Sequence, residues 1–124
     1  TMAGKAGVEM EMAFAADREH LEGDRDQLIQ VFINLFMNSI QAMSEGGRLR
    51  VRVSRPRRYR IEVEDSGIGM SAEEMERAFD PFYTTKERGT GLGLPICYGI
   101  VRSHGGEIDI ESAPGEGTVV RVEL

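Results

Sequence analysis

The sequence contains one cysteine, no tryptophan and no long apolar run. Because Cys97 cannot form a disulfide within the chain, a reducing cytoplasm is the simplest expected location. No stretch approaches the ~20 consecutive apolar residues that a membrane-spanning helix requires, and no segment has the charged and then apolar pattern of a signal peptide. We therefore expect a soluble domain that makes no direct contact with a membrane.

Positive charge is also scarce. The 15 lysines and arginines are outnumbered by 21 aspartates and glutamates, which gives a net charge of -6 at pH 7. A general nucleic-acid binder normally has a basic excess that neutralises phosphates. The composition therefore argues against a nucleic-acid partner, and any polyanionic ligand must be held by a local site.

Glycine, in contrast, is abundant. The chain has 15 glycines in 124 residues, against a usual share of about 7%. Many of them gather in four short segments, at 67–69, 89–93, 105–106 and 115–117. Clustered glycines indicate tight turns or ligand loops within a chain whose length fits a single domain over 1–124.

The hydrophobic pattern predicts five strands and three helices. Alternating apolar residues mark the strands, and apolar residues three and four apart mark the longer helices. Asp24 with Gln27 has the spacing of a helix cap, and Ser71 is the expected N-cap of a short helix with Glu73 and Glu74 in its first turn. The predicted strands are 8–14, 49–53, 59–65, 107–112 and 118–124, and the predicted helices are 25–43, 72–78 and 92–104.

Tight turns between successive strands favour antiparallel pairing. The turns at 54–58 and 113–117 would each close a hairpin. The order of the elements predicts an α+β fold, a two-layer α/β sandwich with a mixed sheet of about five strands and three helices packed on one face.

Seven arginines lie between Arg48 and Arg60 and could form a phosphate-binding patch. Most of them alternate with apolar residues, beside Glu62 and Glu64. This pattern favours a solvated sheet face with ion pairs between strands.

Four amides, Gln30, Asn34, Asn38 and Gln41, follow one another at helical spacing along the first predicted helix. Buried amides need hydrogen-bond partners. The stripe therefore indicates either bonds to neighbouring backbone or a cleft in which amide oxygens meet a hard cation and phosphates.

Asp65 ends a predicted strand and precedes a glycine loop. A carboxylate only accepts hydrogen bonds, so it suits the exocyclic amine of adenine and disfavours the carbonyl that guanine has there. The alternative is a local turn in which the carboxylate bonds a backbone N–H two residues on.

Gly67, Gly69 and Ala72 also match a dinucleotide fingerprint, but the strand that should follow the helix is missing from the pattern.

Three glycines of the segment GTGLGLP come directly before a predicted helix. Bare backbone N–H groups and a helix dipole at such a position can hold anionic oxygens. The sequence has no GxxxxGK[ST] motif, so the segment is not a P-loop, and Lys86 is the nearest cation for a terminal phosphate. A flexible glycine hinge is the structural alternative.

Together these segments resemble the ATP-binding catalytic domain of sensor histidine kinases, of the GHKL superfamily with its Bergerat fold. DQLIQVFINLFMNSIQAM resembles the N box, EDSGIGM the G1 box, FDPFYTTK the F box and GTGLGL the G2 box. The short segment between Lys86 and Gly89, with HGGEIDIES after it, is most similar to kinases of the nitrogen-regulation type. Ala42 departs from relatives that place an aromatic side chain over adenine.

The resemblance implies a site for ATP and Mg²⁺. Asn38 would coordinate the metal through its amide oxygen, and Asn34 would contact phosphate or the water around the ion. Asp65 would bind adenine and Lys86 the γ-phosphate, so that Asn34 and Lys86 are the expected catalytic residues. The other expected cofactor-binding positions are Gly67, Gly69, Gly89, Thr90, Gly91, Gly93, Leu94 and Thr118.

The resemblance also implies the reaction. Related ATPases have a water-activating glutamate where this chain has Asn34, and a neutral amide cannot take a proton from water, so weak hydrolysis is expected. The γ-phosphate would pass to a histidine on a separate dimerisation and phosphotransfer domain of the same parent kinase, and then to a response regulator.

His20 and His104 lack the surroundings of that acceptor, and the isolated chain is not expected to phosphorylate itself. An anti-sigma-factor type serine kinase and a non-catalytic binding module are the alternatives.

Overall fold

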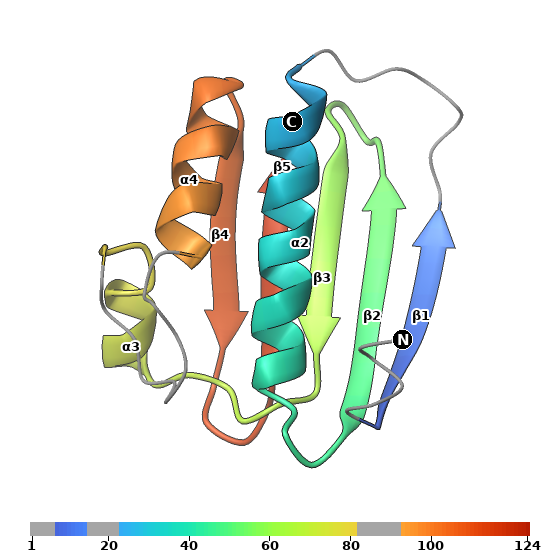
Figure 1. The fold of residues 1–124 in the computed structure, drawn as a ribbon, viewed down its shortest axis with the longest axis vertical. Coiled ribbons are helices and arrows are strands. Elements are labelled where there is room, and N and C mark those ends of the chain that lie inside the picture. Colours follow the sequence, from blue (N-terminus) through green and yellow to red (C-terminus); the bar gives the residue numbers. More distant parts are fainter. Residues whose placement is uncertain (1–6, 15–22, 82–92) are drawn as a thin grey trace.

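The computed structural model describes residues 7–14, 23–81 and 93–124, and all structural statements below concern these residues. They form one sheet in the order β1-β2-β3-β5-β4 (Figure 1). Four strands make an open antiparallel sheet, and β1 joins its edge parallel to β2. The prediction of a mixed sheet is thereby confirmed. The strands are β1 (Val8–Phe14), β2 (Gly47–Ser54), β3 (Arg60–Asp65), β4 (Glu107–Ser112) and β5 (Thr118–Glu123).

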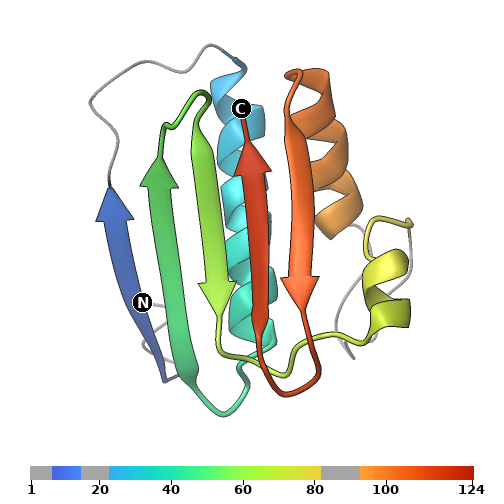
Figure 2. The same ribbon diagram turned by 180° about the vertical axis from the view of Figure 1, so that it is seen from behind.

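Two helices cover one face of the sheet, as the views from the front and from behind show (Figures 1 and 2). They are α2 (Arg25–Gln41) and α4 (Gly93–Ser103). The third described helix, α3 (Ala72–Glu76), lies beyond the β4 edge, so the prediction of three helices packed on one face is wrong. With five residues and none of them buried, α3 is too short to cover the sheet.

The hydrophobic core lies between these two helices and the inner face of the sheet. Alternation along the strands places every second side chain there. Val51 is opposite Val63 and Val53 opposite Ile61. The predicted turn at 54–58 would have set Val53 opposite Tyr59, so these side chains share the predicted face but the pairing is displaced by two residues. The largest fully buried side chains are Val31, Leu35, Met43, Leu49, Val63, Cys97, Val101 and Val122.

Helix caps fix where the helices begin. The Asp24 side chain accepts a hydrogen bond from the Gln27 N–H at 3.0 Å, which confirms Asp24 as the N-cap of α2. The Asp24 N–H in turn donates to Nε2 of His104, at the end of α4, at 3.0 Å. His104 therefore has its proton on Nδ1, which donates to the Ile100 carbonyl at 2.8 Å. Both ring nitrogens of His104 thus make structural hydrogen bonds, whereas His20 lies outside the described residues.

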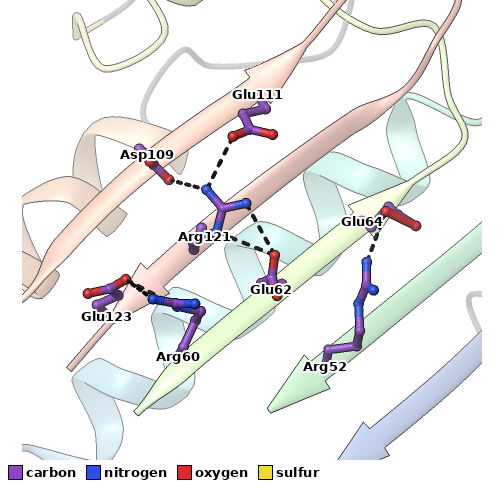
Figure 3. A network of polar contacts seen from close by, with 8 residues as sticks. All are labelled: Arg52, Arg60, Glu62, Glu64, Asp109, Glu111, Arg121 and Glu123. Carbon is purple, nitrogen blue, oxygen red and sulfur yellow. Dashed lines mark hydrogen bonds and ion pairs between the residues drawn. The ribbon is translucent and has the colours of Figure 1, made fainter. Parts of the chain in front are cut away.

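The outer face of the sheet is covered by charge pairs (Figure 3). Arg121 on β5 reaches Glu62 on β3 at 3.2 Å and contacts Asp109 and Glu111 on β4 at 3.4 Å each. Burial alone would lower the pKa of Arg121, but these three carboxylates raise it. Similar pairs join Arg60 to Glu123 and Arg52 to Glu64 at 3.1 Å each. The arginine-rich segment therefore forms cross-strand ion pairs, which confirms the interpretation favoured from its sequence.

Candidate functional site

Two buried polar side chains mark one end of the sheet. Asp65 is the last residue of β3 and Thr118 the first of β5, and the two are directly opposite each other. Both follow the buried alternation of their strands, so they face the helices. Asp65 is 5% exposed and Thr118 is 9% exposed. A buried carboxylate needs partners, and its presence among apolar neighbours identifies this end as the candidate site.

Asp65 makes the local turn that was the structural alternative in the sequence. The Gly67 N–H donates to its Oδ1 at 2.9 Å. A carboxylate has two oxygens with about four acceptor positions, so one such bond orients the group without using all of them. The turn and recognition of a base amine are therefore compatible.

The two glycines after Asp65 are held by close packing. A Cβ at Gly67 would lie 2.5 Å from the carbonyl oxygen of Ala42, and a Cβ at Gly69 would collide with the carbonyl oxygen of Ala113. Gly69 also has φ +72°, where side chains are disfavoured. These contacts explain both glycines structurally, and their approach to a base stays a prediction.

The amide stripe of α2 divides into two pairs. Gln30 and Gln41 are exposed, while Asn34 and Asn38 are partly buried. Asn38 lies against the first residue of α4, since a Cβ built on Gly93 would be 3.6 Å from Nδ2 and 3.7 Å from Oδ1 of Asn38. The structure thus brings one predicted amide to the start of the glycine-led helix.

Asn34 is one turn earlier on α2 and faces Cys97 of α4. Burial of Cys97 raises the pKa of its thiol to about 11, although a hydrogen bond with the Asn34 side chain opposes the shift. The thiol also donates to the Val31 carbonyl at 3.5 Å. Leu94 of α4 packs against the same core. The two helices are therefore joined by apolar packing beneath the candidate site.

The loop after Asp65 and the end of α2 meet directly. The Ile68 N–H donates to the Ala42 carbonyl at 3.1 Å, and the Ala42 N–H donates to the Asn38 carbonyl at 3.0 Å. Asp65 and Asn38 consequently lie at the same end of the molecule. Four predicted site residues, Lys86, Gly89, Thr90 and Gly91, fall outside the described residues.

Ser112 is a polar residue of this region that the sequence did not single out. It is the last residue of β4 and lies directly opposite Thr118. Its hydroxyl is 2.9 Å from Oγ1 of Thr118 and accepts from the Met70 N–H at 2.8 Å. The register of the hairpin around the GEG turn could have identified it, because that register pairs Ser112 with Thr118.

A groove of about 560 Å³ opens nearby, between the ends of β2, β3 and the β4–β5 turn. Its charged walls contain Glu64, Glu111 and Glu116 against Arg48. Asp65, Ser112 and Thr118 also line this groove, so it is part of the candidate site. Its excess of acid disfavours phosphates, whereas it suits a group that donates hydrogen bonds.

The described residues contain no group of three or more His, Cys, Asp or Glu side chains placed to hold a metal ion. None of the helices in the described ranges is both long and apolar enough to cross a bilayer.

The fold and this polar end define an α+β sandwich of a nucleotide-binding type, and comparisons with known proteins agree. The family described as histidine kinase-, DNA gyrase B-, and HSP90-like ATPase matches residues 23–124. The chain belongs to this family and is a catalytic ATP-binding domain of the histidine kinase kind.

Individual relatives support this assignment. Sporulation kinase C of Bacillus subtilis (strain 168) is 47% identical over 105 residues, which is 84% of this chain and 24% of that protein. Sensor histidine kinase ZraS of Klebsiella oxytoca is 44% identical over 101 residues, 80% of this chain and 22% of that protein. The chain thus spans about a quarter of the length of these curated relatives.

Solved structures show the same fold. The catalytic domain of histidine kinase ThkA has a TM-score of 0.87 and 34% identity, over 98% of this chain and 80% of that chain. Full-length ShkA in complex with AMPPNP has a TM-score of 0.88 and 26% identity, over 99% of this chain and 26% of that chain.

Proposed function

We propose that this domain binds Mg·ATP between α2 and α4 and presents the γ-phosphate to a histidine on the dimerisation and phosphotransfer domain of its parent kinase. A response regulator would receive the phosphoryl group next. One observation supports the location above all others. The Asp65 loop bonds to Ala42, one turn after Asn38, and Asn38 lies against Gly93. A candidate base acceptor, a candidate metal ligand and a helix N-terminus therefore share one end of the fold.

The residues at this end fit the proposed ligand. Asp65 offers a buried acceptor for the adenine amine, and Thr118 lies beside it. Asn38 offers an amide oxygen of the kind that Mg²⁺ accepts, together with the phosphates. The start of α4 points partial positive charge at anionic oxygens. Bound Mg·ATP would supply the phosphoryl group, and Lys86 and the glycines Gly89, Gly91 and Gly93 would hold its phosphates.

Asn34 explains why the triphosphate would be kept for a histidine. A neutral amide cannot act as a general base toward water. Its side chain lies within hydrogen-bonding reach of the Cys97 thiol of α4. We therefore expect slow ATP hydrolysis, with catalysis arising from positioning and charge neutralisation.

The finer assignments are part of the same proposal. The short segment before Gly89 and the HGG turn support a kinase of the nitrogen-regulation type, and the single, buried Cys97 is consistent with a cytoplasmic domain. The acidic net charge of -6 supports a protein partner in preference to a nucleic acid.

Two experiments test the proposal. Calorimetric titration with ATP in the presence of Mg²⁺ should give a saturable heat and raise the unfolding temperature. No heat and no thermal shift would leave only a binding module without nucleotide.

Incubation with radiolabelled ATP and an added histidine-containing dimerisation fragment should give acid-labile phosphohistidine. Acid-stable phosphoserine on a protein partner would instead support the serine kinase alternative.

A further inference from the structure

Strands β3, β5 and β4 lie side by side, and β3 and β4 end at the edge where β5 begins (Figure 2). Three polar side chains form a row across these strand ends. Asp65 is directly opposite Thr118, and Thr118 is directly opposite Ser112. Residues directly opposite each other in antiparallel strands point to the same face of the sheet. The row therefore lies on the helix side, at the same end as Asn38 and Gly93.

The Ser112 hydroxyl sets the direction of the hydrogen bonds in this row. It has one proton, and the Gly117 carbonyl, 2.7 Å away, can only accept it. Its oxygen already accepts from the Met70 N–H at 2.8 Å. The 2.9 Å contact with Thr118 must then use the proton of Thr118, because Ser112 has no second proton to donate.

Thr118 consequently has only lone pairs left for any other partner. Asp65, its neighbour on the other side, is also an acceptor when ionised. A water molecule held between two such acceptors must give a proton to each and turn its lone pairs toward the base. The wall formed by Asp65 and Thr118 is therefore complementary to hydrogen-bond donors.

We propose that Ser112 is a specificity-determining positioning residue. Because it accepts the hydrogen bond of the Thr118 hydroxyl, Asp65 and Thr118 present only acceptors to the base, and this selects 6-amino over 6-oxo purine nucleotides. The inference rests on the proposed function, since it assumes that the base lies at Asp65. Without Ser112, the Thr118 hydroxyl can rotate and donate toward the pocket. A donor there tolerates the carbonyl of a 6-oxo purine.

The test compares binding of ATP and ITP, in Mg²⁺ buffer, to the wild-type domain and to Ser112→Ala. ITP has a carbonyl at position 6, an acceptor that the lone pairs of Asp65 and Thr118 repel, whereas its N1–H is a donor that an accepting wall tolerates. The comparison therefore reports discrimination at position 6. We expect the wild type to prefer ATP and Ser112→Ala to lower the ratio of the two affinities about tenfold, in line with the loss of one polar discrimination. Ser112→Thr, which keeps a hydroxyl, should retain most of the ratio.

Ser103→Ala is the matched control, because that hydroxyl also donates to a backbone carbonyl, that of Ile100 at 2.7 Å, but lies at the far end of α4. Its ATP to ITP ratio should equal that of the wild type. An equal loss of both affinities in Ser112→Ala would show a merely structural role and overturn the inference.

A second variant covers the case in which Ser112→Ala does not fold. Thr118→Val removes the oriented hydroxyl itself and should lower the same ratio, and an unchanged ratio would overturn the inference. A wild type that binds ATP and ITP equally would also overturn it while leaving the proposed function standing. Absence of ATP binding by the wild type would instead remove the proposed function.

Discussion

Asn38 of α2 lies against Gly93 of α4, with both amide atoms 3.6 to 3.7 Å from the position that a Cβ of Gly93 would take. Distances of that size are ordinary van der Waals contact. At this contact α2 contributes a side-chain amide, and α4 contributes the free N–H groups of its first turn. This contact places the Asn38 amide beside the N-terminus of α4.

Asn38→Ala should remove Mg²⁺-dependent phosphotransfer while leaving the fold largely intact. The substitution deletes the amide oxygen but keeps a good helix former on α2. Transfer to the dimerisation fragment should fall at least a hundredfold, measured as phosphohistidine formed per minute. Gln41→Ala is the matched control, because Gln41 is an exposed amide one turn further along the same helix. Undiminished transfer in Asn38→Ala would place the metal site elsewhere.

Asp65→Asn should weaken ATP binding about tenfold or more. Asparagine keeps an oxygen for the Gly67 N–H, so the turn is retained, but its N–H₂ group turns donors toward a base amine that also donates. Calorimetry gives the dissociation constant, and the unfolding temperature checks that the turn survives. An unchanged dissociation constant, with the fold intact, would refute recognition of the base by Asp65.

Much of this architecture follows from the sequence because local patterns determine it. Alternation gave the buried face of the β2–β3 hairpin, although not its register, and the spacing of Asp24 and Gln27 gave the start of α2. The charge pairs of the outer face likewise follow from alternation of arginine and glutamate along strands that pair directly.

Contacts between residues distant in sequence could not be predicted in this way. The bond from Asp24 to His104 joins positions 80 residues apart, and it depends on how α2 and α4 pack together. The prediction placed α3 on the sheet with the other helices. The structure shows a helix of five residues, none of them buried, and the sequence pattern did not indicate how little of this helix is buried. The pairing of Ser112 with Thr118 was open to prediction, but the hydrogen bond that Ser112 accepts from the Met70 N–H, 42 residues away, was not.

Gly99→Ala should stabilise the domain by about 0.5 to 1 kcal/mol, because glycine within a helix costs backbone entropy that alanine does not. Gly99 is in α4 and a Cβ there would meet nothing within 4 Å. Gly69→Ala is the opposite case, since its φ of +72° and the Ala113 carbonyl both exclude a side chain. It should destabilise by about 2 kcal/mol or more. Urea denaturation measures both, and a loss of stability in Gly99→Ala would contradict the described helix.

The thiol of Cys97 gives a prediction about alkaline pH. Its pKa is raised from 9.0 to about 11 by burial, so in the folded protein it stays protonated over a range in which the unfolded chain ionises. A raised pKa of this kind contributes stability that is fully present below about pH 9 and is lost as the pH rises toward 11. Ionisation of this thiol alone should lower the free energy of unfolding by about 3 kcal/mol, because a difference of one in pKa corresponds to about 1.4 kcal/mol.

Comparison with Cys97→Ala separates this effect from other groups that titrate at high pH. The free energy of unfolding of the wild type, minus that of the variant, should be constant from pH 7 to 8 and should shrink between about pH 9 and 11. The native thiol should also react slowly with iodoacetamide at pH 8, because only the thiolate is nucleophilic and Cys97 is fully buried. A difference that stays constant up to pH 11, or rapid alkylation of the native protein, would show that α2 and α4 do not enclose the thiol.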